Sequence, residues 1–376
     1  MAESMLRKFS VKGYKNFKEE TTLDLTKVRD YGFNKECITN GLLGKVLIMG
    51  PNGSGKSNLG YALFDIVCTL TDKQACFCQR DAQSFFNRES GLEYATFKYE
   101  FQQGDSVIVY EYRKTQPNTL IYERMSVDDN VIIEFDHRQN RAVIDNLRQV
   151  DSEGLRLDGR RDAPPIIRLI ANSTSQKEGS PIIFLMDFVS RMLYFRSTQD
   201  GNMSIGVERA GDDADPHLIR NGSVDGFEMF LKEDTGLDTR LCTAMTPGLT
   251  EYMVQNLRSK PIAFPNAASS GEKALKLFCY WSKRFDDVSF LFMDEFDAFY
   301  HFELAERIVR SLMDYTGTQV VLTSHNTSIV SNRLMRPDCY LQIRGGRIVS
   351  LSESTERELR EGHNLEKMLR NGEFDE

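Results

Sequence analysis

A glycine-rich stretch between an apolar run and an amphipathic segment constrains the fold of this chain more than any other feature of its sequence. Lys45–Met49 has the composition of a short buried strand, and the next residues, Gly50–Ser57, read Gly-Pro-Asn-Gly-Ser-Gly-Lys-Ser. Ser57–Cys68 then carries apolar residues at helical spacing. A strand, a loop of this composition and a helix form a P-loop, whose backbone N–H groups and helix start surround phosphate oxygens. The sequence therefore predicts an α/β fold that binds a nucleotide.

Two side chains of this loop carry most of its chemistry. Lys56 is expected to reach the β- and γ-phosphates, and the Ser57 hydroxyl is expected to ligate Mg²⁺. A glycine turn without function is the alternative, and the flanking strand and helix argue against it. The implied ligands are ATP and Mg²⁺. The residues expected to contact the nucleotide form one continuous run: Gly50, Pro51, Asn52, Gly53, Ser54, Gly55, Lys56, Ser57 and Asn58.

Polar residues with catalytic potential follow two further apolar runs. Val288–Met293 precedes Asp294 and Glu295, and Gln319–Thr323 precedes Ser324 and His325. Carboxylates at the end of a buried strand are costly unless a cation or hydrogen bonds compensate them. Asp294 is therefore expected to hold the water shell of Mg²⁺, and Glu295 to deprotonate the attacking water. A lone histidine is more often structural, but the place of His325 at the end of the next core strand favours a γ-phosphate contact.

A serine-rich turn opens the helix that precedes the Asp294 strand. Ser269 and Glu272 fit a capping box, which by itself explains both residues. The alternative is a second anion site, made by a serine hydroxyl, the Gly271 N–H and the start of the helix.

Periodicity divides the rest of the chain into three parts. Residues 1–136 hold the P-loop and an antiparallel meander, 137–265 form a mostly helical insertion, and 266–376 return to α/β order. The strands expected in the first part are 5–11, 21–25, 45–49, 94–101, 107–113, 119–125 and 131–135. Helices are expected at 181–195 and 224–232 in the second part and from 269 to 281 and 302–315 in the third, with strands at 288–293, 319–323, 339–344 and 347–351.

Composition and charge narrow the classes of partner. The chain of 376 residues has 47 Lys and Arg against 55 Asp and Glu, so its average field repels polyanions. Nucleic acid would need a local basic patch, for which Met5–Lys18 is the candidate, with a solvated strand face as the alternative. No apolar run reaches the ~20 residues of a membrane helix. The seven cysteines indicate reduced thiols, and a cytoplasmic location without membrane contact is expected.

The order of these motifs resembles the head of the ATP-binding-cassette ATPases. Phe9–Phe17 followed by the P-loop, Asp294–Asp297 with His301, and Asn364–Met368 resemble in particular the SMC/RecF/OLD branch. Within it the chain is similar to the stand-alone bacterial proteins named AAA-fifteen ATPases, often encoded in anti-phage loci. The resemblance covers about 1–135 and 262–376.

The resemblance implies a Mg²⁺-dependent ATPase that forms a homodimer with two ATPs between the heads, compatible with higher oligomers. Ser269, Ser270 and Gly271 would bind, with Glu272, the nucleotide held by the partner's P-loop, and Asp297 would contact the dimer interface. The Mg²⁺-sensing glutamine is not identifiable, with Gln139 as a candidate. The implied setting is phage defence with a separately encoded effector. The alternative is a RecF-like repair or recombination ATPase that binds DNA.

Overall fold

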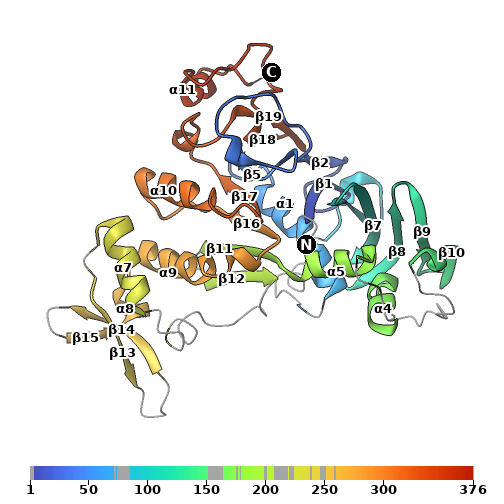
Figure 1. Cartoon of the computed structure of the whole chain (residues 1–376), viewed down its shortest axis with the longest axis horizontal. Coiled ribbons are helices and arrows are strands. Elements are labelled where there is room, and N and C mark those ends of the chain that lie inside the picture. The colour runs from blue at the N-terminus through green and yellow to red at the C-terminus, as the bar shows by residue number, and fades with distance from the viewer. Residues whose placement is uncertain are drawn as a thin grey trace.

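The computed structural model describes residues 4–71, 73, 85–150, 164–174, 177, 179–198, 201–206, 219, 224–237, 239–245, 251–257 and 260–375. Two large sheets dominate this part of the chain, and each has seven strands. One is a mixed, mainly parallel core sheet and the other is antiparallel throughout (Figure 1). The predicted α/β class with an antiparallel β subdomain is confirmed.

The core sheet has the strand order β12-β11-β16-β17-β5-β18-β19. Its central strands β11, β16, β17, β5 and β18 pair in parallel, and β12 and β19 are antiparallel at the two edges. Every residue of the three middle strands is buried, as their continuous apolar runs predict for a sheet covered on both faces. The strands are β5 (Lys45–Met49), β11 (Met192–Thr198), β12 (Gly201–Gly206), β16 (Phe290–Asp294), β17 (Gln319–Ser324), β18 (Tyr340–Arg344) and β19 (Arg347–Ser350).

The antiparallel sheet has the order β10-β9-β8-β7-β6-β1-β2 and contains the expected meander. Its long strands alternate buried and partly exposed residues, because one face packs on the core and the other faces water. The strands are β1 (Ser4–Lys12), β2 (Thr21–Asp24), β6 (Ala95–Gln103), β7 (Ser106–Gln116), β8 (Thr119–Val127), β9 (Asn130–Asp136) and β10 (Arg141–Asp145). The unpredicted β10 buries none of its residues, so its sequence carries no apolar alternation to reveal it.

The helix that follows the P-loop lies between the two sheets. It was expected to be continuous, but it is divided at Phe64 into α1 (Lys56–Leu63) and α2 (Asp65–Leu70). The Tyr99 hydroxyl of the antiparallel sheet donates to the carbonyls of Ala62 and Leu63 at 3.1 Å, and so binds carbonyls at the end of α1. On the other side, Gly60 of α1 packs closely against Phe292 of the core sheet.

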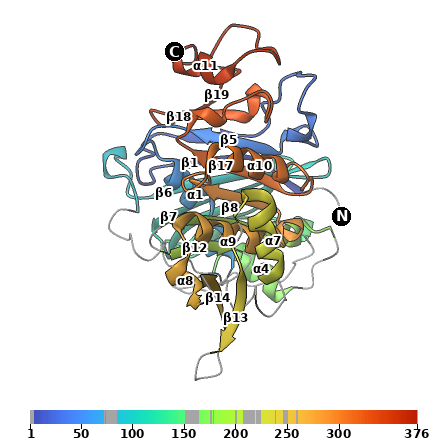
Figure 2. The same ribbon diagram turned by 90° about the vertical axis from the view of Figure 1, so that its left-hand side faces the viewer.

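Other helices cover the opposite face of the core sheet. In Figure 2, α7, α9 and α10 lie in front of the sheet. The predicted helices here are confirmed as α7 (Val224–Thr235), α9 (Ser270–Ser282) and α10 (Phe302–Leu312), and α11 (Leu365–Arg370) lies near the C-terminus. A two-stranded ladder joins β3 (Ile38–Thr39) and β4 (Leu42–Leu43).

The middle of the chain differs from the expected mostly helical lobe, because it holds strands as well as helices. The helix expected over 181–195 ends at Ser190, and Met192–Phe195 is buried within strand β11 of the core sheet. A separate three-stranded sheet projects from the body of the molecule (Figure 1). The three strands of this sheet are β13 (Leu241–Met245), β14 (Glu251–Leu257) and β15 (Lys260–Ala263). The helices of this part of the chain, besides α7, are α4 (Ile166–Ser173), α5 (Pro181–Ser190) and α8 (Phe264–Ala267).

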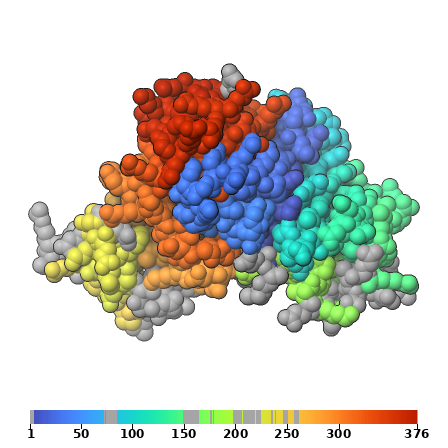
Figure 3. All heavy atoms as spheres, turned by 45° about the horizontal axis from the view of Figure 1, so that its top comes forward, coloured from blue at the N-terminus to red at the C-terminus, as the bar shows by residue number. Residues whose placement is uncertain are grey.

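The two ends of the sequence meet in the core. Strand β5, from the first part of the chain, lies between β17 and β18, which come from the last part. Figure 3 accordingly shows N-terminal residues in blue against C-terminal residues in orange and red. Among the described residues, no helix combines the length and the apolar character needed to cross a bilayer.

Candidate nucleotide site

The polar motifs predicted to form the site follow strands that run in the same direction. Strands β5, β16 and β17 are parallel, and they end at Met49, Asp294 and Ser324. The P-loop, Glu295 and His325 therefore leave the sheet at one edge. Ligands of open α/β sheets bind at this carboxyl edge of the strands.

Glycines allow the backbone of the P-loop to turn tightly. Gly53 and Gly55 have φ of +80° and +107°, in the left-handed region that side chains disfavour. A Cβ atom on Gly50 would lie 2.7 Å from the Ser54 hydroxyl, and one on Gly55 would collide with the amide of Asn16. The loop therefore forms a cradle of backbone that ends at the start of α1.

Lys56 lies folded over this loop. Its Nζ atom donates to the carbonyl oxygens of Gly50 at 2.7 Å and Pro51 at 3.1 Å. Burial lowers the pKa of Lys56, and the negative charges of Asp294 and Glu295 oppose that shift. The ammonium group is therefore within electrostatic reach of both carboxylates.

Asp294 is held in place by hydroxyl groups of two neighbouring strands. Its carboxylate accepts from Thr323 at 2.7 Å and from Tyr194 at 3.1 Å, and the residue is only 1% exposed. This leaves a buried, oriented carboxylate at the edge of the sheet where the P-loop begins.

Glu295 adopts a strained backbone conformation. Its φ of +49° is left-handed, although it is not glycine, and its N–H donates to the Thr323 hydroxyl at 2.8 Å. Such backbone strain is concentrated at functional sites, where the surrounding contacts maintain it.

Arg196 is a site residue that the sequence alone did not reveal. Its Nη2 atom lies 2.6 Å from the Glu295 carboxylate, and its Nε atom lies 3.5 Å from that of Asp294. Burial disfavours the charged guanidinium, but these carboxylates raise the pKa of Arg196 above its ordinary value. The available signal was weak, because Arg196 directly follows the apolar run that was interpreted as a helix.

Asp297 and His325 lie beside each other at the same edge. Asp297 is buried and accepts a hydrogen bond of 2.8 Å from Ser324, whereas His325 is exposed beyond the end of β17. Burial raises the pKa of Asp297, and the Ser324 hydrogen bond and His325 partly offset this.

The predicted capping box at the start of α9 is present. Ser269 N–H donates to Glu272 at 2.8 Å, and Glu272 N–H donates to the Ser269 hydroxyl at 3.2 Å. The Glu272 carboxylate is buried and also accepts from Thr239, so it serves the helix cap. Ser269 and Ser270 are exposed.

The segment Ser269–Gly271, called the signature below, borders a hollow of about 590 Å³ that is separate from the P-loop. Ser269 and Gly271 line it together with residues of α10 and of the turn before it. Gly271 lies close to this turn, since a Cβ atom there would be 3.1 Å from the Phe299 carbonyl. The chain does not bring its own signature and P-loop into one hollow among the described residues.

Two other predicted positions have different roles. The Asn58 side chain donates to Asn16 at 2.6 Å and so ties α1 to the turn after β1. Gln139 lies in the exposed turn between β9 and β10, and its N–H donates to Asp136. Gln139 is therefore not at the site, because the antiparallel sheet carries it away from the carboxyl edge of the core.

Unpaired polar atoms indicate what the site can hold. The Ser54 hydroxyl, the Arg196 Nε and one Asp297 oxygen are buried without a hydrogen-bond partner in the described part of the chain. The Ser54 hydroxyl and the Arg196 Nε are donors that suit phosphate oxygens, whereas the Asp297 oxygen is an acceptor. The residues therefore fit a nucleotide triphosphate, and Ser57 and Asp294 are the residues that would hold its Mg²⁺.

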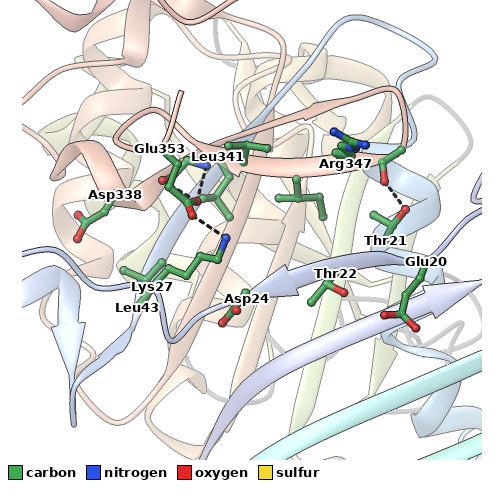
Figure 4. Close-up of a pocket in the computed structure, with 14 residues that line it drawn as sticks. Glu20, Thr21, Thr22, Asp24, Lys27, Leu43, Asp338, Leu341, Arg347 and Glu353 are labelled. Atoms are coloured by element: carbon green, nitrogen blue, oxygen red, sulfur yellow. Dashed lines mark hydrogen bonds and ion pairs between the residues drawn. The ribbon is translucent and has the colours of Figure 1, made fainter. Parts of the chain in front are cut away.

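A smaller hollow of about 250 Å³ lies between the edge strands β2 and β19, and no P-loop residue lines it. Figure 4 shows Lys27 and Glu353 pointing toward each other across it. They form an ion pair of 2.6 Å, and Thr21 donates to the Gly346 carbonyl. Because neither the P-loop nor Asp294 nor Glu295 lines it, this hollow is not the candidate site.

A family model described as "AAA domain, putative AbiEii toxin, Type IV TA system" matches residues 46–331, from β5 to beyond His325. No curated protein matches the chain.

Solved structures of SMC heads are also similar. An Smc head from Pyrococcus furiosus, with an extended coiled coil and bound to the C-terminal domain of ScpA, is 15% identical with a TM-score of 0.47, covering 98% of both chains. The SMC head domain from Thermotoga maritima is 14% identical with a TM-score of 0.42, covering 92% of this chain and 98% of that one.

Proposed function

Because the chain belongs to the family described as "AAA domain, putative AbiEii toxin, Type IV TA system", we propose that it is a dimeric ATP-binding and ATP-hydrolysing switch. The observation that carries this proposal is the convergence of Lys56, Asp294 and Glu295 at one edge of the core sheet. A phosphate cradle, a buried acid and a second acid at such an edge are the parts that phosphoryl transfer to water requires.

Each residue has a separate task in the proposed reaction. The P-loop and Lys56 bind the phosphates, and Ser57 and Asp294 position Mg²⁺, which neutralises charge on the triphosphate. Glu295 orients the attacking water and accepts its proton. In this proposal His325, which follows the neighbouring strand β17, contacts the γ-phosphate.

The placement of the signature supports a dimer. Ser269 and Gly271 line their own hollow rather than the P-loop, and Ser270 between them is exposed. The start of α9 offers backbone N–H groups and hydroxyls to an anion. A second copy that brings its P-loop to this hollow would complete two ATP sites, and larger assemblies of such dimers are compatible with this arrangement.

We place the switch in bacterial defence, in the cytoplasm, as a sensor that acts with a separately encoded effector. The family description, which names a TA system, supports a two-component arrangement. ATP-driven closing and opening of the dimer would then change the contact with the effector.

The contacts of the basic stretch do not favour the DNA-clamp alternative. Lys8 lies 3.6 Å from Asp24, Lys12 lies 3.8 Å from Glu19, and Arg7 hydrogen-bonds to Gln102. Acids therefore lie beside two of the five basic side chains that a clamp would need to present to DNA. DNA-stimulated hydrolysis with a steep salt dependence would restore that alternative.

Calorimetry with ATP and Mg²⁺, followed by measurement of phosphate release, tests the proposal. We expect saturable binding by the full chain and slow hydrolysis. Mass measurements with and without ATP test the dimer. A chain that neither binds adenine nucleotide nor releases phosphate would contradict the proposed function.

A further inference from the structure

Arg196 occupies an unusual place for a basic side chain. It lies on β11 directly opposite Asp294 of β16, as the parallel register of the two strands dictates. Its guanidinium bridges Glu295 at 2.6 Å and approaches Asp294 at 3.5 Å. Both acids assigned to Mg²⁺ binding and water activation therefore share one cation.

The bridge leaves part of the guanidinium unsatisfied. Arg196 Nε is buried and lacks a hydrogen-bond partner among the described residues, because 3.5 Å from Asp294 is too long for a good hydrogen bond. An anion within hydrogen-bond distance would give this buried donor the acceptor that it lacks. The forked donors of a guanidinium match the geometry of phosphate oxygens. A phosphate is therefore a better partner for Arg196 than the Asp294 carboxylate, which the Nε atom only partly reaches.

We propose that Arg196 is a γ-phosphate sensor that holds Glu295 in the nucleotide-free chain and transfers to the terminal phosphate when ATP binds. This inference rests on the proposed function and adds a regulatory step to the same site. In the free chain the Glu295 carboxylate is engaged by Arg196 and is therefore not free to orient the attacking water. A γ-phosphate offers the guanidinium a more highly charged partner, so the transfer frees Glu295 for the water.

The sensor distinguishes nucleotides by their last phosphate. ADP lacks the group that would draw Arg196 away, so ADP leaves the Arg196–Glu295 bridge in place. The difference between the affinities for a triphosphate and a diphosphate therefore measures the role of Arg196 without relying on hydrolysis.

The test compares binding of the non-hydrolysable analogue AMP-PNP and of ADP, each with Mg²⁺, by calorimetry on the full chain. Arg196→Gln is expected to weaken AMP-PNP binding roughly tenfold to hundredfold relative to ADP, as expected for loss of a charged hydrogen bond. Arg191→Gln is the matched control, because Arg191 pairs with Asp187 before the start of β11 and lies outside the site.

Arg196→Lys keeps the positive charge but not the forked donor, so its ratio of affinities should lie between those of the wild type and Arg196→Gln. This variant also decides the question if Arg196→Gln does not fold. If folded variants keep the wild-type ratio of AMP-PNP to ADP affinity, Arg196 is not a γ-phosphate sensor, and the proposed ATPase function is unaffected. A wild-type chain that binds neither nucleotide would instead remove the proposed function and the sensor with it.

Discussion

The Thr323 hydroxyl donates a hydrogen bond of 2.7 Å to Asp294. The same oxygen accepts the N–H of Glu295 at 2.8 Å. One buried hydroxyl of β17 therefore orients the carboxylate assigned to Mg²⁺ and stabilises the left-handed backbone of the residue assigned to water activation. Thr323 acts through these two residues, as a positioning residue.

Replacing Thr323 by Val keeps the shape of the side chain and removes both hydrogen bonds. We expect a loss of roughly 1–3 kcal/mol in the free energy of unfolding, because a buried acceptor and a buried N–H lose their partner. Mg²⁺ affinity in the presence of nucleotide should fall about tenfold or more. Urea denaturation and Mg²⁺ titrations check both effects. Thr96→Val, on the outer face of β6, is the control, and equal behaviour of the two variants would contradict the positioning role.

Lys56→Ala is expected to abolish ATP binding. The variant removes the ammonium that sits over the P-loop carbonyls of Gly50 and Pro51, and with it the partner of the β- and γ-phosphates. Calorimetry with ATP and Mg²⁺ measures the loss. Lys18→Ala changes an exposed lysine and should bind as the wild type does. Undiminished binding by Lys56→Ala would show that the loop is not the phosphate site.

Local patterns predicted most of the residues that meet at the candidate site, and the pairing of distant strands brought in the others. Lys56 and Asp294 could be predicted because each stands at a fixed offset from a strand or loop of recognisable composition. Arg196 and Thr323 could not, because their roles depend on which strands become neighbours and in which register. The apolar run 181–195 was read as one helix for a similar reason, since a buried strand and a buried helix have the same composition over a short length.

Glu295→Gln should retain ATP and accumulate as a dimer. The amide keeps the size of the side chain but cannot accept the proton of the attacking water, so the ATP-bound state persists. Mass measurement at saturating ATP and Mg²⁺ reports the result. Glu361→Gln, at an exposed position, should remain as the wild type. A Glu295→Gln chain that is monomeric with ATP bound would contradict the proposed sandwich.

The buried ion pair of Asp65 and Lys114, at 2.7 Å, joins α2 to the antiparallel sheet. Lys114→Met should cost about 3–5 kcal/mol in the free energy of unfolding, because it leaves a buried carboxylate without its cation. The double variant Asp65→Asn/Lys114→Met should recover most of this loss, since the Tyr112 hydroxyl can still donate to the amide oxygen. Urea denaturation of the single and double variants measures the recovery. An equal loss of unfolding free energy in the single and the double variant would show that the unpaired Asp65 carboxylate is not the cause of the loss.

Lys45 makes the stability of the fold depend on pH. It is 2% exposed at the start of β5, and its ammonium donates to the carbonyls of Tyr315 at 2.9 Å and Thr318 at 2.7 Å. Burial lowers the pKa of Lys45 from 10.5 to about 8, with Cys37 opposing the shift. The folded chain therefore releases this proton at a lower pH than the unfolded chain.

The sign of the effect follows from this difference in proton binding. Between about pH 8 and 10.5 the unfolded chain binds more protons at Lys45 than the folded chain, so the contribution of Lys45 to stability rises with pH. Below pH 8 the burial cost is present in full, on the order of 3 kcal/mol. Lys45→Met removes this cost along with the two hydrogen bonds to the carbonyls of Tyr315 and Thr318.

We therefore expect the free energy of unfolding of Lys45→Met, relative to the wild type, to fall as the pH is raised from 8 to 10.5. Denaturant titrations at several pH values measure this difference, and the subtraction cancels groups that titrate alike in both proteins. Lys367→Met, at an exposed position of α11, should give a difference that does not change with pH. If the difference in unfolding free energy between Lys45→Met and the wild type does not change with pH, this lysine keeps its ordinary pKa despite its burial.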